Sequence, residues 1–171
     1  MSEEDKIREQ LIERFSLPGD KVVVKRARRV FTDVPLADFV QVFDYARSEL
    51  GFCILCTITG LDEGATLGFI YHLARENGTI LNLHISVPKE NPVIKTVTTS
   101  FPAADAYERE LVDLLGAQVE GLPPGNRYPL PDDWPAGQYP LRKDWKGKIS
   151  EIKPVSSDSQ ASRGKEVNEN A

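Results

Sequence analysis

Cysteine and histidine, the residues that most often build metal and nucleophilic sites, are scarce in this chain of 171 residues, which holds two of each. Two cysteines cannot form the disulfide framework of a small secreted protein, so the composition favours a reducing compartment. The longest apolar runs, residues 52–57 and 67–73, are far shorter than the ~20 residues that a membrane-spanning helix needs. The acidic first residues lead into no apolar segment, so we expect no secretory signal.

An excess of basic charge is also absent. The net charge is −5, and phosphate binding depends on basic surface, so nucleic acid and anionic lipid are disfavoured as main partners. Apolar residues make up 40% of the chain and charged residues 27%, which is typical of a globular domain. A chain of this length can bury roughly 70% of its unfolded surface, so a single domain with its own core is expected.

Apolar spacing and turn residues predict an α+β domain. A first helix is expected over residues 3–15, a second from Pro35 to Gly51, and a third from Ala103 or Ala104 to Leu115, ended by Gly116. The segment 21–31 is rich in β-forming residues, and strands are expected over residues 52–60, 65–73 and 79–87. This order predicts helices packed on a mainly antiparallel sheet, within a core domain of residues 1–120.

The pair Asn77-Gly78 predicts a two-residue hairpin turn between the last two strands. Such a turn pairs Glu76 with Thr79 and places His72 opposite Leu83. His72 and His84 then lie on opposite faces of the sheet, which disfavours a shared metal site.

Cys53 and Cys56 have the C-x-x-C spacing, but zinc ribbons need two such pairs, and redox pairs usually precede a helix. Here the pair lies in an apolar predicted strand, so we expect both cysteines to be buried and structural. The alternative is a standalone metal or thiol protein that uses these cysteines with His72 and His84.

A basic run, residues 25–29, lies on or near the first predicted strand. One interpretation is a charged edge strand that blocks association between sheets. The other is a contact with an acidic protein partner, which would suit a free-standing regulatory adaptor.

Proline density changes the chain after Gly121, because prolines recur every few residues and leave no room for a helix or strand. Large apolar residues persist there, so we expect residues 121–145 to form an extended arm packed on its own domain or on a partner. Residues 146–171 are polar and without periodicity, which predicts a solvated or partner-ordered tail.

Dense charge on the third predicted helix and at the end of the arm predicts a binding surface. Glu110 and Asp113 share a helix face, as paired-carboxylate chemistry would require, but no histidine or nucleophile lies near them in sequence. Arginine and tryptophan are over-represented among residues that dominate binding energy. The expected partner contacts are Glu108, Arg109, Glu110, Asp113, Arg127, Trp134, Arg142, Lys143, Asp144 and Trp145.

Two ordered motifs in this part of the chain resemble a known family. They are Tyr107-Glu-Arg-Glu-Leu-Val-Asp-Leu-Leu-Gly116 and, after Gly121-Leu-Pro123 and Arg127, Tyr139-Pro-Leu-Arg-Lys-Asp-Trp145. Together they are similar to the 30 kDa subunit family of respiratory complex I, in element order from about residue 35 to 145. Complex I members usually carry histidine at the position of Leu122. The insert Leu130-Pro-Asp-Asp-Trp-Pro135 is instead similar to relatives in membrane-bound, energy-converting [NiFe] hydrogenases.

The resemblance implies a non-catalytic structural and assembly subunit of a ferredoxin-dependent, hydrogen-evolving complex that couples electron transfer to proton or sodium translocation. It implies no cofactor on this chain, with the nickel–iron centre and iron–sulfur clusters on partner subunits. It also implies a peripheral position on the cytoplasmic face of the membrane, held by a large subunit, iron–sulfur subunits and membrane subunits. A quinone-linked or sulfur-reducing complex of the same kind is the alternative.

Overall fold

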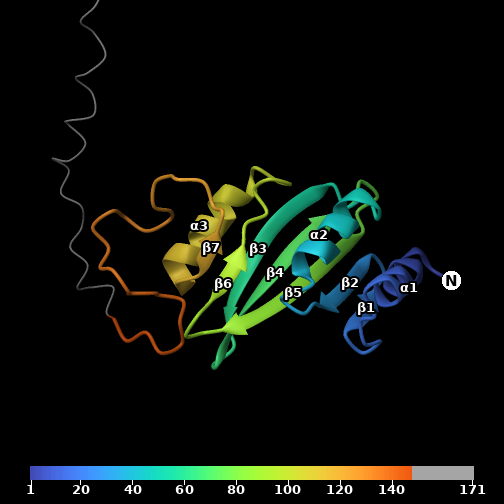
Figure 1. Cartoon of the computed structure of the whole chain (residues 1–171), viewed down its shortest axis with the longest axis horizontal. Helices are drawn as coiled ribbons and strands as arrows, with labels where there is room; N and C mark the ends of the chain where they lie inside the picture. Colours follow the sequence, from blue (N-terminus) through green and yellow to red (C-terminus); the bar gives the residue numbers. More distant parts are fainter. Residues whose placement is uncertain (148–171) are drawn as a thin grey trace, which may run out of the picture.

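The computed structural model describes residues 1–147, so the predicted polar tail falls almost wholly outside the described part of the chain. These residues form three helices and seven strands, which are arranged as shown in Figure 1. The helices are α1 (Glu3–Phe15), α2 (Phe39–Ser48) and α3 (Ala104–Leu115). The strands are β1 (Val22–Arg26), β2 (Arg29–Asp33), β3 (Ile54–Asp62), β4 (Thr66–Ala74), β5 (Ile80–Pro88), β6 (Val93–Lys95) and β7 (Gln118–Glu120).

Five of the strands form one sheet in the order β1-β2-β5-β4-β3. All its neighbours are antiparallel except β2 and β5, which run parallel. The predicted α+β class with a mainly antiparallel sheet is therefore confirmed. The strands β6 and β7, which the prolines around them hid from sequence analysis, form a separate parallel pair.

The helices pack on one face of this sheet. Phe39 and Phe43 of α2 pack against Tyr71 of β4, and their ring centroids lie 4.6 and 5.8 Å from that of the tyrosine. Leu111 and Leu115 of α3 lie directly over Gly60 of β3, where a Cβ would overlap both side chains. Figure 1 shows α2 in front of the sheet, with α1 and α3 toward its two ends.

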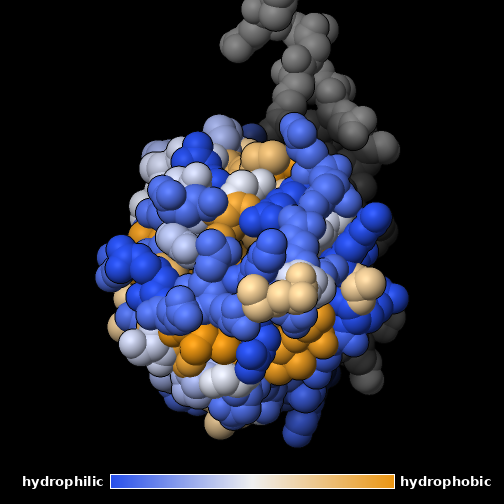
Figure 2. Space-filling model, turned by 90° about the vertical axis from the view of Figure 1, so that its right-hand side faces the viewer, coloured by the Kyte–Doolittle hydropathy of each residue, from blue (hydrophilic) through white to orange (hydrophobic). Residues whose placement is uncertain are grey.

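The start of α1 follows the sequence closely. Ser2 accepts a hydrogen bond from the Asp5 backbone N–H, and the Asp5 carboxylate accepts one from Ser2 N, so the helix begins with a reciprocal capping box. Ile7 and Leu11 are buried on the sheet side. Figure 2 looks onto this α1 end, where a mostly hydrophilic surface is interrupted by small hydrophobic patches.

The basic run does not form a single edge strand. It lies at the turn of a β1–β2 hairpin, where Arg28 has a left-handed backbone with φ of 60°. The backbone N–H of Arg28 donates to Glu4 of α1, and its carbonyl accepts from Ile80 N, so both neighbouring elements fix the turn. The predicted single β-rich segment is thus two strands.

The second helix begins later than predicted, at Phe39 rather than at Pro35. Leu36 and Val40 are 42% and 38% exposed, whereas the buried face is made by Phe39, Val42, Phe43 and Ala46. Pro35 instead opens a turn, because the Asp38 N–H donates to its carbonyl.

The predicted register between β4 and β5 is wrong by one residue. Arg75 N donates to Thr79 O and Gly78 N donates to Arg75 O, so the loop holds three residues and Gly78 adopts φ of 81°. His72 consequently pairs with Asn82 instead of Leu83. A shift of one residue in the pairing changes which residues of β5 share a face with those of β4. Both histidines therefore lie on the same face of the sheet, opposite to the helices.

The cysteines are not buried. Both are free thiols with exposed side chains at the β3 edge of the sheet, which corrects the expectation of a structural core role. Cys56 occupies a bulge, because the β3–β4 register shifts between Leu55 and Thr57. Its exposed side chain follows the buried Leu55 along the strand.

Candidate functional site

The residues of the two sequence motifs meet where the arm (residues 121–145) crosses α3. Asp113 of α3 is the first anchor, with a side chain only 8% exposed. Its carboxylate accepts from Arg127 Nε at 3.0 Å and from Leu130 N at 3.2 Å. A buried carboxylate with a charged partner and a backbone donor is a strong, directional contact, so it fixes the path of the arm.

Arg127 also connects the arm to itself. Its Nη1 donates to Trp134 O at 2.9 Å, and the Trp134 indole donates to Gln138 O at 2.8 Å. Trp145 donates to Gln138 Oε1 at 2.8 Å, and the two indole centroids are 6.2 Å apart. The arm therefore has a small packed centre of its own, in which Trp134 is buried.

The C-terminal end of α3 forms the second anchor. Gly116 ends the helix with φ of 74°, and the arm supplies donors for the last carbonyls. Arg142 Nε donates to Leu115 O at 2.7 Å, and Leu141 N donates to Leu114 O at 3.1 Å. The Arg142 guanidinium also lies over the Tyr139 ring, 4.6 Å from its centroid.

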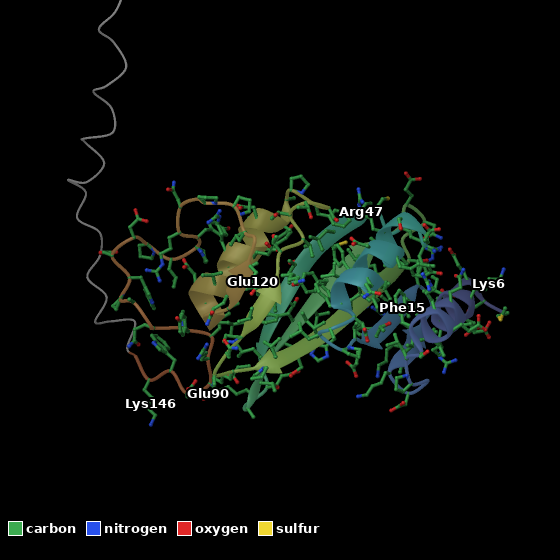
Figure 3. All side chains as sticks on the ribbon, in the orientation of Figure 1. Lys6, Phe15, Arg47, Glu90, Glu120 and Lys146 are labelled. Carbon is green, nitrogen blue, oxygen red and sulfur yellow. The ribbon has the colours of Figure 1, made fainter. Side chains whose placement is uncertain are left out.

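A third anchor, invisible to sequence analysis, joins the arm to the far ends of β3 and β5. Lys89 Nζ bridges Asp62 and Asp144, at 2.7 Å from each carboxylate, and Asp62 also accepts from Lys143 N at 2.7 Å. The Lys89 hydrogen bond and those from Lys143 and Gly64 lower the pKa of Asp62 to about 2, although burial opposes them. Figure 3 labels Glu90, which follows Lys89, and Lys146, which follows the arm.

Glu108 is fully buried inside the domain and is not a surface contact, which corrects its placement among the partner-binding residues. Its carboxylate accepts from Val97 N at 2.7 Å and Thr96 Oγ1 at 2.6 Å, and so ties the segment after β6 to α3. Burial raises the pKa of Glu108 against these hydrogen bonds. The sequence placed Glu108 on a charged helix face, but the helix turns that position inward.

Arg109 and Glu110 occupy the outer side of α3. Arg109 donates to both oxygens of Asp105 at 2.8 and 2.9 Å and to Pro123 O at 2.6 Å. A Cβ at Gly125 would overlap its guanidinium, so the start of the arm lies against this arginine. Glu110 is half-buried. Asp113 is committed to the arm, so it does not form a working carboxylate pair with Glu110.

The surface left for a partner is the outer side of the arm. Lys143 and Asp144 are exposed and Trp145 is half-buried, while Tyr128 and Leu141 expose 51% and 54% of their surface. Sequence analysis did not single out Tyr128 and Leu141 as exposed residues, because it treated all apolar residues of the arm alike. That these residues bind a partner stays a prediction.

The cysteines and histidines do not gather into a metal site. Among residues 1–147 no cluster of three or more histidine, cysteine, aspartate or glutamate side chains has metal-binding geometry. His72 is instead held between Thr59 and Asn82, with its Nε2 and Nδ1 at 2.9 and 2.6 Å from them. His84 lies between Asp33 and Glu63, at 2.8 and 3.2 Å.

Comparison with known proteins identifies what this arrangement is similar to. Residues 32–151 match the family model described as "Respiratory-chain NADH dehydrogenase, 30 Kd subunit". The membrane-bound hydrogenase subunit beta of Pyrococcus furiosus is 32% identical over 165 residues, which cover 89% of this chain and 91% of that protein. A subunit of the NADH-quinone oxidoreductase of Moorella thermoacetica is 29% identical over 104 residues, or 59% of this chain and 70% of that one.

A solved structure shares the fold. It is a chain in the structure of the membrane-bound sulfane sulfur reductase, an archaeal respiratory membrane complex. The TM-score is 0.71 at 24% identity, over 99% of this chain and 96% of that chain. In the part of the chain that the structure describes, no helix combines the length and the apolarity that a membrane crossing requires.

Proposed function

Because this chain belongs to the family of the 30 kDa subunit of respiratory-chain NADH dehydrogenase, we propose that it is a structural subunit of a membrane-bound, ferredoxin-dependent, hydrogen-evolving hydrogenase. The observation that carries the proposal is the similarity to the Pyrococcus furiosus hydrogenase beta subunit, which extends over nearly the full length of both chains. In this proposal the complex couples electron transfer to the translocation of protons or sodium ions.

The geometry supports a scaffold rather than a reaction centre. Charged residues of the two motifs position the arm, because Asp113 binds Arg127 and Arg142 caps α3. A preformed arm loses little conformational freedom when it binds, so its outer side can contact a partner at low entropic cost. We assign Lys143, Asp144 and Trp145 to contact with the large subunit.

The proposal assigns the redox chemistry to other chains. This chain carries no cofactor of its own in the proposal, and partner subunits hold the nickel–iron centre and the iron–sulfur clusters. Membrane subunits carry the ion pathway and hold this chain at the cytoplasmic face. The acidic surface, with its net charge of −5, suits a protein partner better than nucleic acid.

A second candidate is the equivalent subunit of a quinone-linked or sulfur-reducing complex. It is favoured by the similarity to the NADH-quinone oxidoreductase subunit of Moorella thermoacetica and by the fold shared with a chain of the sulfane sulfur reductase. The two candidates differ in the metal of the large subunit, because only the hydrogenase contains nickel.

The test is a mild-detergent purification of the tagged full-length chain from native membranes, with identification of the proteins recovered and metal analysis. The hydrogenase proposal expects a nickel-containing large subunit together with iron–sulfur and membrane subunits. A nickel-free large subunit would move the chain to the second candidate. A chain recovered alone would contradict both.

A further inference from the structure

The basic run of residues 25–29 takes no part in the contacts that position the arm. It lies at the tip of the β1–β2 hairpin, beside the start of α1 and at the opposite end of the molecule from the arm (Figure 1). Ala27 and Arg28 alone join the two strands. We call the four cations of this run, Lys25, Arg26, Arg28 and Arg29, the basic tip, and all but Arg29 are exposed.

The charges of the basic tip are not neutralised within the described part of the chain. None of the four side chains belongs to an ion pair among residues 1–147. Two carboxylates of α1 lie nearby, but Glu4 accepts from the backbone N–H of Arg28 and Glu3 pairs with Arg75. The basic tip is therefore a local excess of positive charge on a chain whose net charge is −5.

Two guanidinium groups of the basic tip converge on Gly78, in the loop between β4 and β5. Arg29 Nη1 donates to Gly78 O at 3.2 Å and to Arg28 O at 2.7 Å. A Cβ on Gly78 would stand 3.7 Å from Arg28 Nη1. Backbone carbonyls thus hold the charge of Arg29 in place without cancelling it. Like charges gathered at one glycine repel each other, and the planar donors of each guanidinium match a carboxylate.

The basic tip keeps its arginines at a cost in stability. Arg28 is the second residue of the two-residue turn and has φ of 60°, a conformation that glycine adopts without strain. Arg26 pairs directly with Arg29 across the hairpin, and like charges in opposed positions destabilise a sheet. A glycine at the first position and an acidic residue at the second would be more stable. Stability therefore does not explain these arginines, and binding does.

The backbone of the basic tip is fixed before any partner arrives. Arg28 N donates to Glu4 at 2.6 Å, and Arg28 O accepts from Ile80 N at 2.9 Å. The β1–β2 register shifts at Lys25, which is the extra residue of a bulge and adds a further cation to the tip. A partner meets charges on a backbone that is already in place, so binding costs little backbone freedom.

The charge of the rest of the chain distinguishes among acidic partners. A membrane of anionic lipid or a nucleic acid would attract the basic tip and repel much of the remaining surface, because the net charge is −5. A short acidic segment of a protein meets the tip alone, since charges more than ~10 Å away are largely screened. Arginine, which dominates the tip, binds carboxylates through paired hydrogen bonds. These considerations favour a protein segment with clustered carboxylates.

We propose that the basic tip docks an acidic segment of a neighbouring subunit, in which aspartate or glutamate side chains lie side by side. The contact is separate from the arm, and the inference rests on the proposed function, because it takes the neighbour from the same complex. The other interpretation of the basic run is a charged edge that blocks association between sheets. Charge of either sign would serve that purpose, whereas docking of an acidic segment requires positive charge.

The test places a photo-crosslinking residue at Ala27 in the tagged full-length chain, which is purified from native membranes after irradiation. We expect a crosslink to one subunit, through a peptide with neighbouring acidic residues. Lys25→Glu with Arg26→Glu should lower the crosslink yield at least about tenfold. Arg14→Glu with Arg47→Glu reverses two exposed cations of α1 and α2, changes the net charge equally, and should leave the yield within roughly twofold of wild type.

Arg28→Gly separates binding from folding. The substitution relieves the left-handed backbone and removes one cation, so the thermal midpoint should stay equal or rise while the crosslink yield falls severalfold. A purely structural role for Arg28 predicts the reverse, a lower midpoint and an unchanged yield. That result would contradict the inference.

A binding measurement on the isolated chain distinguishes the sources of negative charge. We expect a polyglutamate peptide to bind at least about fivefold more tightly than vesicles of anionic phospholipid or a DNA duplex, and to lose affinity with Lys25→Glu and Arg26→Glu. Tighter binding of the vesicles or the duplex would assign the basic tip to a membrane or a nucleic acid and overturn the inference.

The crosslinking results also separate the two proposals. Full yield from the Lys25→Glu, Arg26→Glu variant, equal loss from both pairs of substitutions, or a crosslinked peptide without acidic residues would each overturn the inference. So would recovery of the complex with no crosslink from position 27, and in that case the proposed function stands. A wild-type chain recovered with no other subunit would overturn the proposed function itself.

Discussion

Tyr139 lies against Gly116 so closely that a Cβ on the glycine would stand 2.6 Å from the tyrosine ring. Gly116 belongs to the end of α3 and Tyr139 to the arm, so one contact joins the two motifs that are separated in sequence. The glycine is needed twice there, once for its left-handed backbone and once for the missing side chain. This contact explains why a helix end and a distant proline-led segment belong to one structural unit.

Gly116→Ala should destabilise the chain by about 2–3 kcal/mol, because it adds a steric overlap to the cost of a left-handed backbone. Gly137→Ala is the matched control, since Gly137 has the same φ of 74° but open space around its Cα. We expect about 1 kcal/mol for the control. Urea unfolding measures both, and equal losses would mean that Tyr139 yields to the added methyl group.

Asp113→Ala should release the arm, because it leaves Arg127 and the Leu130 N–H without their acceptor. The expected cost is about 2–3 kcal/mol, as for other partly buried ion pairs that lose one member. Limited proteolysis should then cleave within residues 121–145 several times faster. Asp105→Asn, which removes the more exposed pair with Arg109, should cost less than about 1 kcal/mol and leave the arm protected.

Asp62 should make stability depend on acid pH. The pKa of Asp62 is lowered to about 2. Its contribution to the free energy of unfolding is therefore fully present above the unfolded pKa of ~3.9 and is lost as the pH falls through the folded value. Asp62→Asn should cost on the order of 2 kcal/mol at pH 6 and almost nothing at pH 2. Urea unfolding between pH 6 and 2 tests this, with Asp132→Asn in the exposed arm as the control. A constant cost across this range would contradict the assignment.

Glu108 should act in the opposite sense. Burial raises the pKa of Glu108 above the unfolded value. The stability that Glu108 contributes therefore falls as the pH rises through the folded pKa. Glu108→Gln keeps an acceptor for Val97 N–H and removes this loss, so the stability gap between pH 4 and pH 7 should narrow. Glu108→Ala leaves the buried Val97 N–H without its acceptor and removes the hydrogen bond to Thr96, so it should cost about 3 kcal/mol at pH 4 and less at pH 7. If glutamine and alanine were equally costly, the buried hydrogen bonds would have no net value.

Both thiols should react in the folded chain, because Cys53 and Cys56 are exposed. Titration with a thiol reagent under native conditions should count two groups at similar rates. Three positions of extended strand hold their Cα atoms roughly 10 Å apart, too far for a disulfide, so mild oxidation should yield no internal bond. If the thiols reacted only after denaturant was added, the cysteines would be buried and the prediction would be wrong.

Local patterns in the sequence were sufficient for α1, α3 and the three long strands, but not for the short strands or for the pairing of strands. The span of α3 and its end at Gly116 follow from apolar spacing and a glycine, both of which are local. The β4–β5 register does not, because the Asn77 side chain donates to Glu3 of α1, which is 74 residues away in the sequence. This hydrogen bond accompanies a loop of three residues, whereas the Asn77-Gly78 pair alone predicted a loop of two residues.

The candidate site shows the same division. Asp113, Arg127 and Arg142 could be singled out because they belong to dense charged motifs. Asp62 and Lys89 could not, since each is an ordinary charged residue at the end of a strand. Only the meeting of β3, the segment after β5 and the arm gives them a shared role. The burial of Glu108 could not be predicted either, because the spacing of residues along a helix does not distinguish a buried carboxylate from an exposed one.

The parallel pairing of β2 with β5 has a consequence for the growing chain. Arg29 pairs with Ile80, so the hairpin of β1 and β2 is complete long before its neighbour has been synthesised. Until β5 leaves the ribosome, β2 presents an unpaired edge beside apolar side chains, a state prone to wrong pairing. The basic turn at the hairpin tip and α1, which packs along it, are then its only protection among the residues already made. Pairing across so many residues also requires a costly loop closure, so joining this hairpin to the rest of the sheet should be the slow step of folding.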